Sequence, residues 1–267
     1  MDMLVVIRGG GDIATGIALR LHRAGMEVVI CETACPTAIR RTVCFSEAVR
    51  LGEAVVEGVT ARRADLEEVP DILAQGVIPV LVDPTGACID PLVSDAVVDA
   101  ILAKRNLGTT IDMAPVVVAA GPGFTAGVDC HAVVETMRGH YLGRVVYDGS
   151  ALPNTGVPGL IGGKSGERVL RAPADGIFQG VRRIGEQVRE GDTAGYVDGI
   201  PMLCTTGGTL RGLLADGVPV TAGMKCGDVD PRCEPDHCRC VSDKALAVGG
   251  GVLEAILHFS GALEAIL

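Results

Sequence analysis

Short hydrophobic runs recur through the first half of the chain, separated by longer stretches in which apolar residues fall at helical spacing. Runs of this kind, rich in Val, Ile and Leu, are typical of strands buried on both faces. Their alternation with helical stretches indicates a parallel sheet covered by helices. We predict strands at residues 4–8, 27–31, 54–57, 77–82 and 116–120, and an amphipathic helix at 95–104.

A glycine-rich turn follows the first apolar run and opens a helical stretch. Gly9-x-Gly11-x-x-Ala14 matches the dinucleotide-binding fingerprint in its Ala-ended form, and Glu32 ends the second run, close to where an acid would bind a ribose. Glycines let the backbone approach a pyrophosphate, which the exposed N–H groups of the helix can hold. We therefore predict that residues 1–125 form a Rossmann-like nucleotide-binding domain.

The charges around this turn leave an alternative open. Asp12 stands where a phosphate would approach, and it could instead cap the helix and repel an anion. Arg8, Arg40 and Arg41 could offset that repulsion, because a guanidinium binds phosphate oxygens in a bidentate manner. The alternative to a nucleotide site is a strand–turn–helix unit that holds no ligand.

Two further loops, 82–86 and 120–124, directly follow predicted strands. In an α/β sheet such loops lie at the carboxyl edge, where ligands bind, although Pro and Gly can also simply end a strand. The complete set of predicted nucleotide-binding residues is Arg8, Gly9, Gly11, Asp12, Ala14, Glu32, Arg40, Arg41, Gly121 and Gly123.

The second half of the chain has a different texture, with short predicted strands punctuated by glycine. We interpret residues 126–166 as a connecting segment and residues 167–230 as a β-rich domain that resembles the barrel-sandwich fold of biotinyl and lipoyl carriers. Pro201 stands where those carriers have their modified lysine, which favours a docking or ligand-covering module over a carrier. Residues 231–267 would form a Cys-rich loop and a C-terminal helix that returns to the first domain, because an apolar helix needs a surface to cover.

The chain has ten cysteines, and several of them gather near its end. Four cysteines and a histidine within fifteen residues could bind zinc or an iron–sulfur cluster, although their spacing matches no standard motif and reduced thiols are the alternative. A second group, Asp129, His131, Glu135 and His140, could also bind a metal or be ordinary helix-face pairs. The predicted C-terminal metal ligands are Cys226, Cys233, His237, Cys238 and Cys240.

Composition narrows the range of partners. The net charge of −10 and the lack of a basic run argue against nucleic-acid binding. No stretch approaches eighteen uncharged apolar residues, and the first apolar run leads into a glycine turn rather than a cleavage site. We expect a cytoplasmic homo-oligomer that contacts no membrane and keeps its thiols reduced.

Several short stretches together carry a family resemblance. They include residues 8–14, 38–41, 82–84, 104–108, 121–124, 135–140, 212–214, 227–232 and 242–244. With these stretches the chain resembles the selenium-dependent molybdenum hydroxylase system protein family (YqeB-type), which is related to xanthine dehydrogenase accessory proteins. This resemblance implies a cytoplasmic accessory protein that helps to mature a molybdenum hydroxylase with labile selenium, with the hydroxylase or its other maturation proteins as partners.

Three functions follow from these observations. The first is a maturation factor that binds a nucleotide or the molybdenum cofactor, with Asp112 and His140 as candidates for acid–base chemistry and cysteines as carriers of sulfur or selenium. The second is an NAD(P)-dependent oxidoreductase acting on a small molecule, although no hydride-transfer signature accompanies the fingerprint. The third is a noncatalytic module that docks a partner. Whether the protein is an enzyme stays open on the sequence alone.

Overall fold

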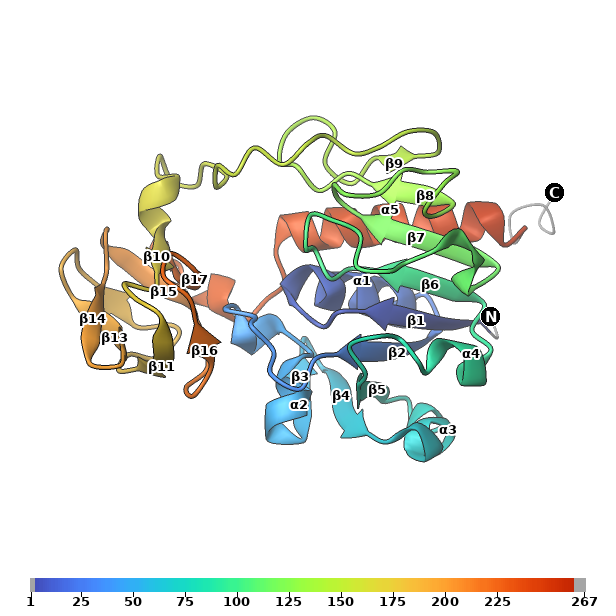
Figure 1. Ribbon diagram of the computed structural model, residues 1–267, viewed down its shortest axis with the longest axis horizontal. Coiled ribbons are helices and arrows are strands. Elements are labelled where there is room, and N and C mark those ends of the chain that lie inside the picture. The colour runs from blue at the N-terminus through green and yellow to red at the C-terminus, as the bar shows by residue number, and fades with distance from the viewer. Residues whose placement is uncertain (1–2, 262–267) are drawn as a thin grey trace. The chain divides into compact units, whose positions relative to one another are not determined.

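The computed structural model describes residues 3–261 (Figure 1). The chain divides into two compact units, and neither of them is continuous in sequence. The first unit comprises Met1–Pro36, Cys44–Asn154 and Val241–Leu267, and the second comprises Thr37–Val43 and Thr155–Cys240. Within the described residues, no helix combines the length and the apolar character needed to cross a membrane.

A nine-stranded sheet, counted over residues 3–261, forms the centre of the first unit, with strand order β3-β4-β5-β2-β1-β6-β7-β8-β9. The strands from β4 to β8 are parallel, whereas β3 pairs antiparallel with β4 and β9 pairs antiparallel with β8. The strands are β1 (Leu4–Arg8), β2 (Glu27–Glu32), β3 (Glu53–Val56), β4 (Val59–Ala64), β5 (Ile78–Val82), β6 (Ala96–Asp99), β7 (Val116–Ala120), β8 (Ala132–Val134) and β9 (Val145–Val146).

Helices α1 and α5 pack against each other and against the central strands (Figure 1). Their axes approach closely at Gly16 of α1, where a β-carbon would lie only 2.6 Å from that of Ala245 in α5. A residue with a side chain at position 16 would therefore push the two helices apart. The helices of this unit are α1 (Asp12–Arg23), α2 (Glu47–Leu51), α3 (Val69–Leu73), α4 (Ile89–Leu92) and α5 (Asp243–Phe259).

Strand β6 replaces the helix predicted at 95–104. Its Val97 and Val98 pair with β1 on one side and β7 on the other, and both are fully buried. β-branched residues fit a pleated, buried surface well, so pairing with two neighbouring strands outweighs the helical spacing of the local sequence. As a result, Asp99 ends its strand directly opposite Arg8, at the carboxyl ends of two adjacent parallel strands.

The second unit contains two four-stranded antiparallel sheets within the described residues, with orders β10-β17-β15-β12 and β14-β13-β11-β16. Apolar side chains from both sheets share one buried core that includes Phe178, Met202, Leu210 and Val229. The strands are β10 (Val169–Arg171), β11 (Gly176–Gly180), β12 (Gln187–Val188), β13 (Thr193–Val197), β14 (Ile200–Leu203), β15 (Gly208–Leu213), β16 (Pro219–Val220) and β17 (Lys225–Asp230).

A buried ion-pair network ties the second unit together. Arg168 and Arg211 both bind Asp228, at 2.9 Å from Arg168 Nη1 to Oδ1 and 2.9 Å from Arg211 Nε to Oδ2. Arg211 also reaches Asp230, which binds Arg232. Buried charges of both signs satisfy one another here, which is the condition for burying them at tolerable cost.

The predicted fold class is wrong. The large sheet is mixed, because antiparallel strands form both of its edges, so it is not the Rossmann-like parallel sheet that the glycine turn suggested. The second unit consists of two separate antiparallel sheets and takes in residues 37–43 from the first part of the chain, so it is not the self-contained barrel-sandwich domain expected for residues 167–230. The local patterns located strands and turns, but they did not specify the edges of the sheet or the long-range partners.

Candidate functional site

Strand β1 is the point from which later strands are added to the sheet in both directions. Strands β2 and β5 lie on one side of β1, and β6 and β7 lie on the other. In open α/β sheets, ligands bind beyond the carboxyl ends of the strands at such a switch point. The carboxyl edge carries the loop that starts at Gly9, the ends of β2 and β6 at Glu32 and Asp99, and the loop that starts at Asp83.

Glu32 binds the glycine loop of its own chain. Its Oε2 accepts the backbone N–H of Gly10 at 2.8 Å, and its Oε1 accepts that of Thr33 at 2.7 Å. Residue 10 also packs against Ser46, whose N–H donates to the Gly10 carbonyl at 2.9 Å. Because both carboxylate oxygens hold backbone donors, Glu32 organises the loop, and a ribose hydroxyl would have to compete for those oxygens.

The two glycines of the fingerprint have different roles. Gly9 has φ +98°, and a β-carbon there would lie 3.0 Å from the backbone of Ala100 and Ile101, so the turn requires glycine. Gly11 is the N-cap residue of α1, and a β-carbon there would meet nothing within 4 Å. Ala14, the last fingerprint residue, is buried in the core. Gly11 thus leaves the start of α1 open to approach from outside.

The guanidinium group of Arg8 is bound by other side chains of the protein. Its side chain is 3% exposed, ion-paired with Asp99 at 3.7 Å and hydrogen-bonded to the Thr109 hydroxyl, which in turn donates to Asp99 at 2.6 Å. Burial raises the pKa of Asp99, and the hydrogen bond from Thr109 and the charge of Arg8 oppose that rise. The structure therefore assigns Arg8 to a buried ion pair that joins the ends of β1 and β6.

Arg40 and Arg41 belong to the second unit, whereas the glycine loop belongs to the first. Arg40 Nη2 donates to the carbonyls of His237 and Cys240, at 2.9 and 3.2 Å, and Arg41 Nε donates to that of Leu213 at 2.7 Å. Both guanidinium groups thus bind backbone carbonyls within their own unit.

Lys244 is a cation near the start of α1 that the sequence did not single out as a binding residue. Ser242 caps α5 by accepting the Ala245 N–H at 3.2 Å, which places Lys244 in the first turn of that helix. Burial lowers the pKa of Lys244, while the neighbouring charge of Asp12 raises it. The charges of Arg138 and Lys104 lower it further and that of Glu135 raises it. Arg138 is itself ion-paired with Asp243 at 2.8 Å.

Gly121 and Gly123 serve close packing after β7. Their φ angles are +84° and +110°, and a β-carbon would lie 2.7 Å from the Thr136 hydroxyl in the first case and 2.6 Å from the Arg105 Cα in the second. Glycine is required at both positions by the backbone and by the neighbouring loops. Neither position needs a ligand to explain it.

The two candidate acid–base residues lie at opposite ends of the parallel strands, one at the amino ends and the other at the carboxyl ends. Asp112 precedes β7 in a one-turn 3₁₀ helix, Ile111–Met113, and His140 follows β8. Because β7 and β8 are parallel, the start of one and the end of the other are at opposite edges. Asp112 and His140 therefore do not form a catalytic pair.

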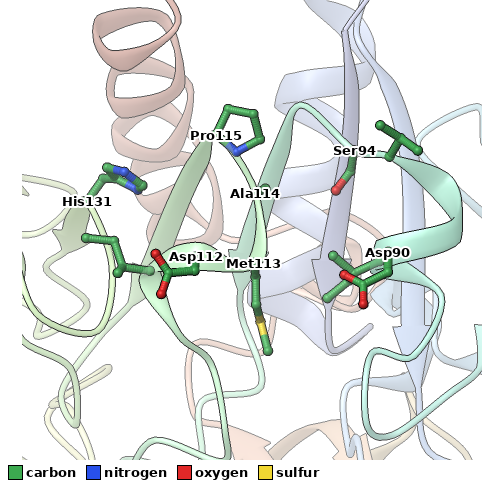
Figure 2. A pocket seen from close by; sticks show the side chains of 10 residues that line it. Asp90, Ser94, Asp112, Met113, Ala114, Pro115 and His131 are labelled. Carbon is green, nitrogen blue, oxygen red and sulfur yellow. The ribbon is translucent and has the colours of Figure 1, made fainter.

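Asp112 instead lines a cavity of about 610 Å³ at the amino edge of β6, β7 and β8. Figure 2 shows Asp112 and His131 on one side of this cavity and Asp90 and Ser94 on the other. His131 Nδ1 accepts the Val117 N–H at 2.9 Å, so the proton of the neutral imidazole is on Nε2. The cavity lies at the edge opposite to the one where parallel α/β sheets usually bind ligands.

The group that the sequence proposed around residue 131 is held by backbone contacts. Asp129 accepts the Thr125 N–H at 2.8 Å, and the buried Glu135 accepts those of Met137 and Leu152 at 2.6 and 2.7 Å. Residues 132–134 form β8, so the helix-face alternative is also wrong. These acids stabilise loops at the edge of the sheet.

Within the described residues, the C-terminal cysteines and His237 are not among the side chains whose ligand atoms converge as a possible metal site. Cys226 and Cys238 are buried, and burial raises the pKa of both thiols. Cys233 and Cys240 are exposed, and each thiol donates to a nearby backbone carbonyl. His237 lies 3.8 Å from Asp230, at the end of the buried ion-pair network. Metal binding by these five residues therefore stays a prediction from the sequence.

A different thiol pair lies at the carboxyl edge of the sheet. Cys31 is near the end of β2, and Cys88 immediately precedes α4, with their Sγ atoms 3.1 Å apart. A carboxylate oxygen of Asp83 completes a group whose three ligand atoms all lie within 4.8 Å of one another. The sequence pointed to the loop at 82–86 but not to these cysteines, which come together only because β2 and β5 are neighbours.

Comparison with known proteins adds one extensive relative. No protein-family model matches the chain. Over 255 residues it is 54% identical to the uncharacterized protein YqeB of Escherichia coli strain K12. The chain is a homologue of YqeB. The alignment takes in 95% of this chain and 47% of YqeB, so the chain spans about half the length of that relative. The name YqeB states no activity, and the part in molybdenum hydroxylase maturation therefore stays a prediction.

Similarity to solved structures is weak. A succinylglutamate desuccinylase/aspartoacylase of Rhodobacter sphaeroides is 26% identical over 25% of this chain and 22% of that one, with a TM-score of 0.23. An aspartoacylase family protein of Mesorhizobium loti and a succinylglutamate desuccinylase of a Silicibacter species are 13% and 12% identical, each over 85% of this chain and 84% of that one, with TM-scores of 0.26. TM-scores this low carry no activity over to this chain.

Proposed function

We propose that this protein is an accessory factor in the maturation of a selenium-dependent molybdenum hydroxylase, and that it binds the phosphate of a nucleotide or of the molybdenum cofactor beside Gly11 and Lys244. The homology to YqeB, together with the family resemblance of the sequence, supports the accessory role. Because YqeB is about twice as long, the proposal concerns the contribution of the part that this chain spans.

The observation that carries the binding proposal is the partly buried Lys244 near the start of α1. Burial disfavours its charged form, so an anion that pairs with the ammonium would restore part of what burial costs. The α1 N-terminus adds partial positive charge, and the N-cap residue Gly11 has no side chain to cover it. The carboxylates of Asp12 and Glu135 oppose an anion, whereas Lys104 favours it. Arg138 is already ion-paired with Asp243 at 2.8 Å.

The contacts of Glu32 favour recognition of a phosphate over recognition of a ribose. Both of its oxygens already accept backbone donors, so the residue expected to bind a dinucleotide ribose is engaged in the fold. This weakens the NAD(P)-dependent oxidoreductase hypothesis. The docking-module hypothesis differs in another way, because it predicts no dependence on Gly11 or Lys244.

Calorimetric titration with ATP, NAD and isolated molybdenum cofactor tests the binding step. Gly11→Leu should abolish the affinity without unfolding the protein, because a β-carbon at residue 11 meets nothing within 4 Å. Lys244→Met should weaken it at least tenfold. Gly250→Leu is the matched control, since residue 250 is exposed on α5 and is also open to a side chain. Failure of the wild-type protein to bind any of these ligands would refute the binding step.

The accessory role requires a test in cells. Deletion of the gene should lower the activity of the molybdenum hydroxylase without lowering its amount, and the wild-type protein should restore that activity. Gly11→Leu and Lys244→Met should fail to restore it, and Gly250→Leu should succeed. Equal restoration by all variants would exclude a role for this site and favour a docking module.

A further inference from the structure

We propose that Cys31, Cys88 and Asp83 form a binding site for one thiophilic d¹⁰ metal ion of the Zn(II) class. This inference goes beyond the proposed function, because it concerns different residues and a different ligand. The three side chains come from β2, from the residue that follows β5 and from the residue before α4, and their ligand atoms lie within 4.8 Å of one another.

Strand pairing and the hydrogen bonds of one loop hold these ligands in place. Strands β2 and β5 pair in parallel with Cys31 opposite Leu81. Asp83, the first residue after β5, therefore lies near Cys31. Asp83 then closes its own loop, because Oδ1 accepts the Gly86 N–H at 2.9 Å and Oδ2 accepts the Cys88 N–H at 2.8 Å. The closed loop brings the Cys88 thiol back to within 3.1 Å of the Cys31 thiol.

The distance between the two thiols is close to the one that a tetrahedral site requires. Zn–S bonds of about 2.3 Å at a tetrahedral angle place two sulfurs about 3.8 Å apart, so the thiol pair has to open by less than about 1 Å. Asp83 Oδ2 has room for a second partner beside the Cys88 N–H, since a carboxylate oxygen has two lone pairs. The bonds to Oδ1 orient the carboxylate as outer-shell partners do in metal sites.

The charges at this site call for a cation. Cys31 and Cys88 are 3% and 5% exposed, and their two thiols lie beside the Asp83 carboxylate. The nearby cation Arg8 is already ion-paired with Asp99. Two thiolates and a carboxylate are thus stabilised together only when a metal ion joins them, and binding should release two protons.

The ligand set selects the class of ion. Thiolates disfavour the hard ions Mg²⁺ and Ca²⁺, and a carboxylate ligand disfavours Cu(I), whereas Zn²⁺ accepts both ligand types. Three protein ligands leave the fourth tetrahedral position for water or another small ligand. This position would lie at the carboxyl edge of the sheet, next to the loops that follow β2 and β5.

Cobalt(II) provides an optical test on protein reduced with a non-thiol reductant under anaerobic conditions. The background variant replaces the exposed cysteines with serine (Cys35→Ser, Cys233→Ser and Cys240→Ser), which removes adventitious surface thiols. One equivalent of Co(II) should produce tetrahedral d–d bands and a charge-transfer band with the intensity of two thiolates. Zn(II) should displace it, and two protons should be released for each ion bound.

Substitutions in this background locate the site. Cys88→Ser should halve the charge-transfer intensity or abolish binding, and the control Cys130→Ser, at a buried thiol elsewhere in the same unit, should leave the spectrum unchanged. If Cys88→Ser does not fold, the test rests on the background variant. Its charge-transfer intensity and the number of protons that it releases then show whether two thiolates bind the ion. The proposal is overturned if that variant shows no cobalt–thiolate band, if the band survives in folded Cys88→Ser, or if Cys31 and Cys88 only form a disulfide. None of these results bears on phosphate binding at Gly11 and Lys244.

Discussion

Glu32 and Gly10 bind each other, with the Glu32 carboxylate accepting the Gly10 backbone N–H at 2.8 Å. The acid at the end of β2 thereby fixes the glycine turn at the end of β1, and a second bond from Thr33 holds the carboxylate in place. Charge-assisted hydrogen bonds of this kind are stronger than neutral ones. The turn is therefore organised before any ligand arrives.

Glu32→Ala should lower the free energy of unfolding by about 1–3 kcal/mol, because the backbone N–H groups of the turn lose their acceptor. The protein has no tryptophan, so urea unfolding is best followed by circular dichroism. Glu27→Ala, at an exposed position of the same strand, should change the stability little. Equal effects of the two substitutions would contradict the role given to Glu32.

Gly16→Val should destabilise the first unit by about 1–3 kcal/mol, since the added atoms cannot fit between α1 and α5. Gly250→Ala provides a control with the opposite sign. Residue 250 is exposed in α5, and alanine there should stabilise the helix by up to about 1 kcal/mol. Thermal unfolding of both variants tests the close approach of the two helices.

Arg211→Met should be the most damaging of these changes, with an expected loss of about 3–5 kcal/mol, because it leaves Asp228 and Asp230 short of a buried partner. Arg183→Met removes an exposed arginine from the same unit and should cost little. A small effect of Arg211→Met on the urea midpoint would show that the network contributes little to stability.

Asp230 should make the second unit sensitive to acid. Burial alone would raise the pKa of Asp230, but hydrogen bonds from Arg232 and the charge of Arg211 outweigh it and lower the pKa to about 2 from the ordinary 3.8. The resulting stabilisation is present above pH 4 or so and is lost as the pH falls towards about 2, on the order of 1 kcal/mol after solvent screening. Urea midpoints measured across this range should depend less on pH in Asp230→Asn than in Asp236→Asn, an exposed control.

Lys244→Met should make the protein more stable while it weakens anion binding. Burial lowers the pKa of Lys244, so the folded state bears a cost for the charged ammonium that the unfolded state does not. The stability of the wild-type protein should then rise with pH as Lys244 loses its proton, and this rise should vanish in the variant. A fall in the melting temperature of Lys244→Met would argue that the ammonium has a structural role.

The sequence predicted local structure better than it predicted partners. The turn at Gly9 and the start of α1 at Asp12 follow from glycine placement and apolar spacing. The strand at β6 was missed because Val97 and Val98 are stabilised by neighbours on both sides, which no local window contains. The same reason applies to sites. Cys31 and Cys88 are 57 residues apart, and only the order of strands brings their thiols together.

Candidate residues that failed did so because the protein itself satisfies them. Arg8 suits phosphate chemically, but strand pairing puts it opposite Asp99, and the two charges neutralise each other. Asp112 and His140 are plausible acid–base groups in isolation, yet the parallel direction of β7 and β8 separates them. Residue type alone does not show which partner a buried charge has.

The segment Thr37–Val43 has a consequence for any attempt to divide this protein. The Ile39 carbonyl accepts the Leu213 N–H at 2.8 Å, and the Ile39 side chain covers Gly212 on β15. A fragment cut at residues 155 and 240 would lose this cover and expose backbone that is paired in the intact chain. The second unit therefore cannot be expressed as one continuous fragment of the chain. A fragment of residues 155–240 would need the segment Thr37–Val43 added as a separate peptide or fused to it.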